Sequence, residues 1–97
     1  MKIKELKWLD NVSDGVIVAS YCIVKVNSYI KMEFQISHDK VEDVYYLHSF
    51  GKGSIRRLQP DKFQTVEEAK TSAYGIYKNE LIQIKKAVDS FLSENNR

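Results

Sequence analysis

The chain has 97 residues and a formal net charge of +2, with 43% hydrophobic and 29% charged residues. These values predict one globular domain over residues 1–97 that forms its core without a disulfide or a metal. The small net charge does not imply a whole-molecule attraction to nucleic acid or to membranes. The single cysteine, Cys22, excludes an internal disulfide and a cysteine-based zinc site, and we expect it to be buried in a reducing compartment.

The N-terminal sequence MKIKELKWLD alternates charged and apolar residues, so we expect no signal peptide there. The longest mostly apolar run, residues 16–24, is far shorter than the roughly 20 residues of a membrane-spanning helix. We therefore expect a cytoplasmic protein with no membrane partner.

Residues 1–62 read as strands and loops. A short first element around Trp8, a predicted core residue, ends at residues 10–11, and Asp14-Gly15 marks a turn. Residues 16–26 favour a strand because they are mostly β-branched or aromatic. Apolar residues at both alternating sets of positions leave two interpretations, a strand covered on both faces or a bend near residues 19–20.

Two more strands follow a predicted hairpin turn at Asn27-Ser28, where Asn tolerates the left-handed conformation. Residues 29–36 alternate clearly between apolar and polar positions. A polar connection at residues 37–43 leads to a strand at residues 44–50, and the loop at residues 51–62 offers a short edge strand at 55–58. In the strand at 29–36, the residues expected to face inward are Ile30, Met32, Phe34 and Ile36. In the strand at 44–50, one face is expected to carry Tyr45, Leu47 and Ser49, and the other face Tyr46, His48 and Phe50.

Residues 63–97 are predicted to be one long amphipathic helix with a short tail. Thr65 and Glu68 have the spacing of a capping box, in which the Glu68 carboxylate reaches back to the N–H of Thr65. About 28 helical residues give roughly 40 Å, against about 27 Å for a strand of eight, so the helix should overhang the sheet. We predict an α+β fold, with an antiparallel sheet of about four strands and one C-terminal helix on one face.

The apolar stripe of this helix is wider than one sheet face needs, because Tyr74, Ile76 and Ile82 lie beside it. One explanation is a broad groove between helix and sheet, and another is a second interface that forms a homodimer. A bend at Gly75 is a third explanation.

Catalytic and cofactor signatures are missing from the sequence. His38 and His48 have no metal-ligand spacing, and no Ser, His and Asp occur in a recognisable triad context. We therefore expect a non-enzymatic protein without cofactor or metal.

The candidate partner-binding site is the basic loop with two neighbouring aromatic residues. Paired arginines on a glycine-rich loop suit contacts with carboxylates or phosphates, and tyrosine gives a rigid anchor. The alternative is a solvated loop, and the acidic residues of 39–43 are expected to pair with it. The site comprises Lys52, Arg56, Arg57, Lys62, Tyr45 and Tyr46.

Four segments together resemble a diffuse group of small bacteriophage and prophage accessory proteins. These are Leu6-Lys7-Trp8, Tyr21-Cys22-Ile23, the aromatic strand at 29–34, and FQTVEEAK at 63–70. The chain departs from that group at Ala19-Ser20, where a glycine turn is usual, and in its longer 51–62 segment. The resemblance covers most of the chain through fold-forming residues.

The resemblance implies a phage or mobile-element protein acting in the cytoplasm of a bacterial host. Some proteins of this kind resemble anti-CRISPR inhibitors, which occlude a host surface without chemistry. We therefore predict a binding protein whose partner is a host protein, with a small nucleic-acid-binding module as the alternative.

Overall fold

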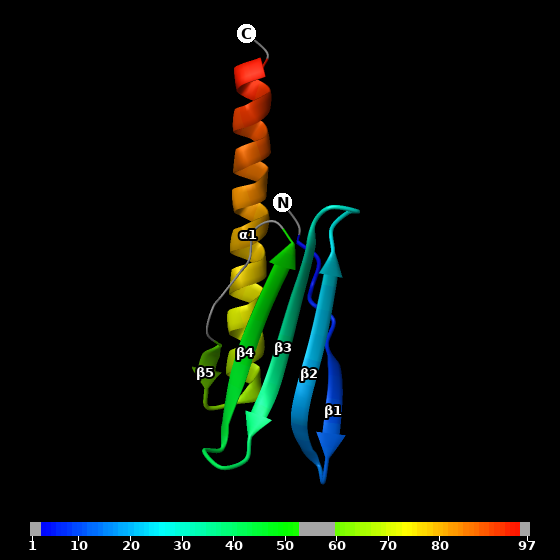
Figure 1. Cartoon of the computed structure of the whole chain (residues 1–97), viewed down its shortest axis with the longest axis vertical. Helices are drawn as coiled ribbons and strands as arrows, with labels where there is room; N and C mark the ends of the chain where they lie inside the picture. Colours follow the sequence, from blue (N-terminus) through cyan, green and yellow to red (C-terminus); the bar gives the residue numbers. More distant parts are fainter. Residues whose placement is uncertain (1–2, 53–59, 96–97) are drawn as a thin grey trace.

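A computed structural model describes residues 3–52 and 60–95, with only the backbone described at 51–52 and 94–95. Within these residues the fold is α+β, as predicted, with an antiparallel five-stranded sheet and one helix on one face (Figure 1). Each strand pairs with its neighbours in the sequence, in the order β1-β2-β3-β4-β5. The elements are β1 (Leu9–Ser13), β2 (Val16–Lys25), β3 (Lys31–Asp39), β4 (Val44–Lys52), β5 (Asp61–Phe63) and α1 (Val66–Asn95).

Tight connections produce this antiparallel order. Asp14 and Gly15 both have positive φ, 53° and 77°, which is the geometry of a two-residue hairpin turn whose twist matches the strands. Between β3 and β4, the Asp39 carboxylate accepts hydrogen bonds from the N–H groups of Val41 and Glu42 at 2.9 and 3.2 Å. Short connections of this kind leave successive strands no alternative to antiparallel pairing.

The β2–β3 connection differs from its prediction. Asn27 acts through its side chain, whose Oδ1 accepts from the N–H groups of Tyr29 and Ile30 at 2.7 and 2.9 Å. In residues 3–52 and 60–95, only Asp14 and Asp43 are non-glycine residues with positive φ, so Asn27 does not adopt the left-handed conformation. An Asn side chain that mimics a backbone turn performs the same task without that conformation.

The core lies between α1 and the face of the sheet that carries Cys22, Phe34 and Leu47. Ala69 and Ala73 are fully buried, and their small side chains let the helix backbone approach the sheet closely. Tyr77 closes the core further along the helix. The prediction of a first strand around Trp8 that ends at residues 10–11 is wrong in its bounds, because residues 3–8 are irregular and β1 runs from Leu9 to Ser13. The irregular segment still contributes to the core through Ile3, Leu6 and Trp8.

A β-bulge in β2 resolves the two interpretations of residues 16–26. Asn11 pairs with Ala19 and Val12 with Ile17, so Val18 is skipped in the register. The bulge exchanges the two faces of the strand, and Ile17 packs against the core as a result. The alternative of a strand covered on both faces is wrong, because Ile23 is 50% exposed on the face away from the helix.

The start of α1 keeps half of the predicted capping box. The Glu68 N–H donates to the Thr65 hydroxyl at 3.1 Å, as predicted. The Glu68 carboxylate instead accepts from the N–H of Gln64 at 3.4 Å, one residue before the expected partner. Glu67 and Glu68 also place negative charge at the positive end of the helix dipole.

The predicted overhang of the helix is present. The 30 residues of α1 span about 45 Å at 1.5 Å per residue, and the molecule measures 60 × 23 × 21 Å. Figure 1 shows the C-terminal part of α1, coloured orange and red, extending beyond the sheet without a sharp bend. We call residues 85–95, which follow the last core-packed residue Ile84, the projecting end. The described part of the chain has no helix long and apolar enough to cross a membrane.

Candidate interaction surfaces

The predicted basic site is described only in part. Arg56 and Arg57 lie outside the described residues, and Lys52 ends β4 with only its backbone described. Lys62 lies in β5, where its ammonium group is 3.0 Å from the Glu42 carboxylate. The hydrogen bond to Glu42 raises the pKa of Lys62. The predicted pairing of acidic residues with the basic segment is therefore confirmed for Glu42 and Lys62.

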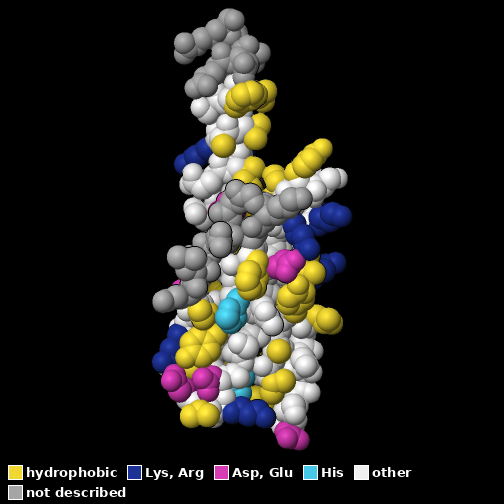
Figure 2. Space-filling model, viewed as in Figure 1, with side chains coloured by type: hydrophobic (Ala, Val, Ile, Leu, Met, Phe, Trp, Pro, Cys, Tyr) yellow, Lys and Arg dark blue, Asp and Glu magenta, His cyan; other side chains and the backbone are white. Residues whose placement is uncertain are grey.

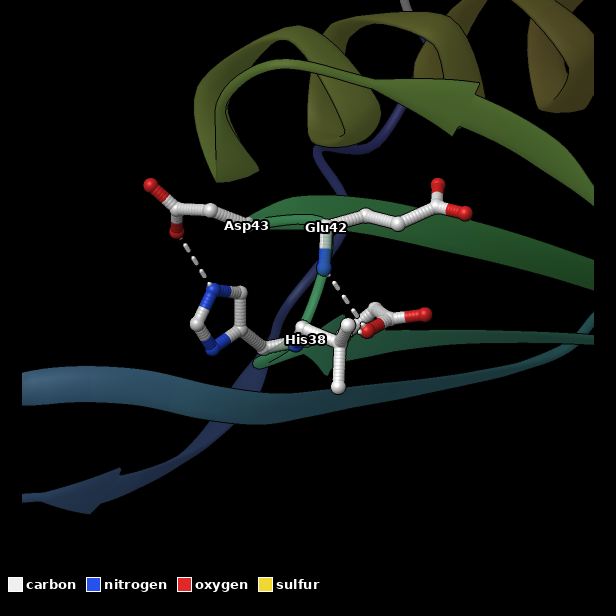
Figure 3. Close-up of polar contacts among 5 residues, drawn as sticks. His38, Glu42 and Asp43 are labelled. Atoms are coloured by element: carbon white, nitrogen blue, oxygen red, sulfur yellow. Dashed lines mark hydrogen bonds and ion pairs between the residues drawn. The ribbon is translucent and has the colours of Figure 1, made fainter.

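The remaining acidic residues of the β3–β4 connection also have local partners. Figure 3 shows the His38 ring directed at Asp43, with a separation of 2.8 Å between Nε2 and Oδ1, while Glu42 extends in the other direction. The His38 ring also stacks on Tyr45, with ring centroids 4.7 Å apart. Asp39 holds the backbone of the same turn. This connection is thus an ordered structural element whose charges are largely compensated locally.

Tyr45 and Tyr46, the two predicted aromatic anchors, lie on opposite faces of the sheet, as their alternation requires. Tyr45 is half-buried and packs against the core on the helix side. Tyr46 is half-buried on the other side, and its hydroxyl donates to Glu42 at 3.4 Å. The two tyrosines therefore cannot belong to one contact surface.

The face of the sheet away from α1, which we call the open face, is rich in exposed apolar residues (Figure 2). Leu9, Tyr21, Ile23 and Phe50 are 76%, 37%, 50% and 48% exposed. The rings of Phe50 and His48 are stacked, with centroids 6.2 Å apart and an angle of 4° between the ring planes. The signal for this surface in the sequence is the second apolar set of positions in β2, which has no helix to cover it.

A charged network crosses the middle of the open face. The Tyr21 hydroxyl donates to Glu33 at 2.8 Å, and Lys31 lies 2.8 Å from the same carboxylate. Hydrogen bonds from Lys31 and then Tyr21 lower the pKa of Glu33, whereas the bond to Glu33 raises the pKa of Tyr21. The network holds a carboxylate among apolar side chains.

The projecting end of α1 forms a second exposed apolar surface. Val88, Phe91 and Leu92 are 50%, 64% and 52% exposed. The residues predicted as a dimer surface lie nearer the sheet and are all half-buried; of these, Tyr74 and Ile76 pack against the core, and the third is Ile82. The large exposed apolar residues of the helix therefore lie about two to three turns beyond the end of that predicted surface.

A polar cluster that the sequence did not indicate connects β1, β2 and α1. The Ser20 hydroxyl and the Lys70 ammonium group donate to the Asp10 carboxylate at 2.5 and 3.0 Å. These hydrogen bonds, that from Ser20 first, lower the pKa of Asp10. Lys70 also lies 5.6 Å from the centre of the Trp8 ring. Ser20 is only 1% exposed, so this cluster holds elements together and gives a substrate no access to the hydroxyl.

Cys22 is buried, and desolvation raises the pKa of its thiol, which makes it a packing residue of low reactivity. The described residues contain no group of three or more His, Cys, Asp or Glu side chains placed to hold a metal ion. Comparison of the chain with protein-family models, curated proteins and solved structures gave no match. The basis for a functional proposal is therefore the geometry of the two exposed surfaces.

Proposed function

We propose that this chain is a non-enzymatic binding protein that presents the projecting end of α1 to a partner protein. The observation that carries the proposal is the exposure of Val88 and Leu92, both about half exposed, on a helix that has passed beyond the sheet. Apolar surface of this kind gains about 25 cal/mol per Å² when a partner removes it from water.

The mode of binding that fits this surface is a helix in an apolar groove. Val88, Phe91 and Leu92 have the spacing i, i+3 and i+4, which places all three on one side of the helix. They continue the stripe of Ile84, which packs against the core. A helix of about 12 residues is marginal on its own in water. The projecting end continues from a half that is packed against the sheet, so the cost of ordering it is met during folding.

The expected partner is a host protein. The resemblance to phage and prophage accessory proteins supports this choice, and with it the inhibition of a bacterial defence system by occlusion of a protein surface. The basic segment of Lys52, Arg56 and Arg57 remains part of the proposal as a second contact, suited to carboxylates at the rim of an apolar groove.

The test is a pull-down from a bacterial lysate with a matched set of variants. Val88→Glu/Leu92→Glu places two charges on the apolar side of the projecting end. The control, Ser90→Glu/Ser93→Glu, adds the same charges to the polar side of the same turns. We expect the wild type and the control to retain the same partner, and the apolar-side variant to lose it by more than about tenfold.

Equal recovery by all three proteins would show that the projecting end is not the contact surface, and recovery of no partner by the wild type would contradict a binding function. Arg56→Glu/Arg57→Glu, assayed in parallel, measures the contribution of the basic segment. Recovery unchanged by this variant would remove the basic segment from the site.

A single-stranded nucleic acid is the second candidate partner. The observation that favours it is a set of three lysines at paired positions on adjacent strands, Lys25 with Lys31 and Lys31 with Lys52, on the strands that carry the exposed aromatic residues. The Glu33 carboxylate among these aromatic residues opposes phosphate binding. Retardation of single-stranded DNA or RNA in low salt that weakens steeply as salt rises would support this candidate, and its absence would exclude it.

A further inference from the structure

Each of the three central strands has a lysine at one end and an aspartate at the other end or within two residues of it. These residues are Lys25 and Asp14 for β2, Lys31 and Asp39 for β3, and Lys52 and Asp43 for β4. Because the three strands form an antiparallel meander, the register places all three lysines at one end of the sheet and all three aspartates at the other. The sheet therefore has a basic end and an acidic end.

The middle of the open face lies halfway between these ends. Tyr21, Gln35 and His48 are cross-strand partners that form one row. Lys31 lies four residues from Gln35 in one direction along β3, and Asp39 lies four residues away in the other. A rotation of 180° about an axis along this row would bring the basic end of one sheet over the acidic end of another.

We propose that two copies of this chain pack their open faces together with this two-fold symmetry, so that the facing strands run antiparallel. Each β3 then crosses the β3 of its partner near Gln35. Lys31 of one protomer faces Asp39 of the other, and Lys25 faces Asp14. The interface is isologous, as in most homodimers. It uses the open face and does not depend on the binding function proposed for the helix.

Charge decides between the two possible symmetric arrangements. With the strands of the two copies parallel, the lysines of one basic end would face those of the other, which is unfavourable. With the strands antiparallel, Lys31 faces Asp39 and Lys25 lies over the turn that holds Asp14. Asp43 takes no part, because it is bonded to His38 on the helix side. Asp39 already accepts backbone hydrogen bonds, and Lys31 already pairs with Glu33. A carboxylate has about four acceptor positions and an ammonium group has three donors, so Lys31 can also bind Asp39 of the partner.

The shape of the open face is also self-complementary about the central row. A hollow lies on the side of Tyr21 toward Ala19, and its lining also includes Leu9, Asn11 and Gln35. Ile23 lies two residues from Tyr21 in the opposite direction and is 50% exposed. The same two-fold rotation places Ile23 of one copy over the Ala19 hollow of the other. An exposed apolar side chain thereby meets a hollow of the size that receives one.

The area of the open face approaches the requirement of a dimer. With strands of nine or ten residues at its centre, at about 3.3 Å per residue and 4.8 Å per strand, the face covers roughly 550 Å² in projection. Accessible surface exceeds its projection, and a stable interface buries about 800 Å² per partner. The three exposed apolar side chains of the projecting end offer a far smaller area, so self-association through the helix alone is not favoured.

Sedimentation equilibrium at micromolar concentrations tests the dimer. We expect a mass twice the 11.3 kDa of the chain. Ile23→Glu and Phe50→Glu should each weaken association by more than about tenfold, whereas Val88→Glu/Leu92→Glu should leave it unchanged. Circular dichroism checks that each variant is folded, and two separate open-face variants guard against the loss of one to misfolding. The helix variant also separates this proposal from the binding function of the projecting end.

Cross-linking tests the orientation. Packed sheets are about 10 Å apart, too far for a direct disulfide, so a short bis-maleimide is the reagent. Gln35→Cys should cross-link to itself near the two-fold axis, and Lys78→Cys on the exposed side of α1 should not. Lys31→Cys should cross-link with Asp39→Cys in a mixture but not with itself. Cys22 is buried and should not react.

Three results would contradict the proposed dimer. A species of 11.3 kDa at every micromolar concentration would overturn it. Dimers that are lost in Val88→Glu/Leu92→Glu but kept in both open-face variants would also overturn it, because the helix would then be the interface. Self-cross-linking of Lys31→Cys would show the parallel arrangement and contradict the antiparallel one.

Discussion

The two faces of the β-sheet carry similar residue types in different environments. Phe34 on the helix-covered face is fully buried, whereas Phe50, one strand away, is 48% exposed on the open face. The helix and the segment before β1 make this difference by covering one face, since the alternation along β3 and β4 is equally regular on both sides. The covered face therefore supplies stability, and the open face supplies surface for interaction.

The largest expected difference between the two faces is in stability, when the same Phe→Ala substitution is made once on each face. Phe34→Ala opens a cavity in the core and should lower the free energy of unfolding by about 3–5 kcal/mol. Phe50→Ala should lower the free energy of unfolding of the monomer by less than about 1 kcal/mol, because the Phe50 side chain is already half exposed to water. Urea denaturation at a concentration where the protein is monomeric measures both. Equal losses of stability in the two variants would mean that another part of the same chain covers Phe50 on the open face.

A second matched pair lies within the covered face. The Ser20 hydroxyl donates to Asp10, so Ser20→Ala should cost about 1–2 kcal/mol. The buried Ser49 hydroxyl has no hydrogen-bond partner among the described residues, so Ser49→Ala should be neutral or stabilising by up to about 1 kcal/mol. Thermal denaturation of the two variants compares them directly. A clear loss of stability in Ser49→Ala would show that this hydroxyl has a partner.

The helix start provides a smaller test of what keeps one face covered. Thr65→Ala removes the acceptor for the Glu68 N–H and should lower stability by about 1 kcal/mol. Thr65→Ser keeps the hydroxyl and should restore most of that loss. If Thr65→Ala and Thr65→Ser are equally stable in urea, the hydroxyl does not stabilise the start of α1.

The smallest expected effect is the pH dependence contributed by Asp10 at the edge of the covered face. Its folded pKa is lowered by Ser20 and then Lys70, so its contribution is present above the unfolded pKa of about 3.9 and is lost as pH falls through the folded value. Asp10→Asn should therefore be less stable than wild type at pH 7 by up to about 1 kcal/mol, with a smaller difference near pH 3. Urea midpoints at the two pH values measure this. A constant difference would show that the charge of Asp10 is not involved.

Local patterns in the sequence were sufficient for β2, β3, β4, the helix and its overhang. They did not identify β5, and the edge strand predicted at 55–58 lies outside the described residues. Alternation identified β3 and β4, the Thr65–Glu68 spacing identified the start of α1, and helix length predicted the projecting end. These features depend on backbone periodicity and on neighbours within about four residues, which a sequence displays directly.

Only the tertiary structure decided which residues become surface. The bulge at Val18 turned Ile17 to the core, and packing of α1 on one face left Tyr21 and Ile23 exposed on the other. The contact of Asp10 with Lys70 joins residues 60 positions apart in the chain. The free energy of such contacts depends on which apolar face is buried by which distant element, and no local pattern contains that information.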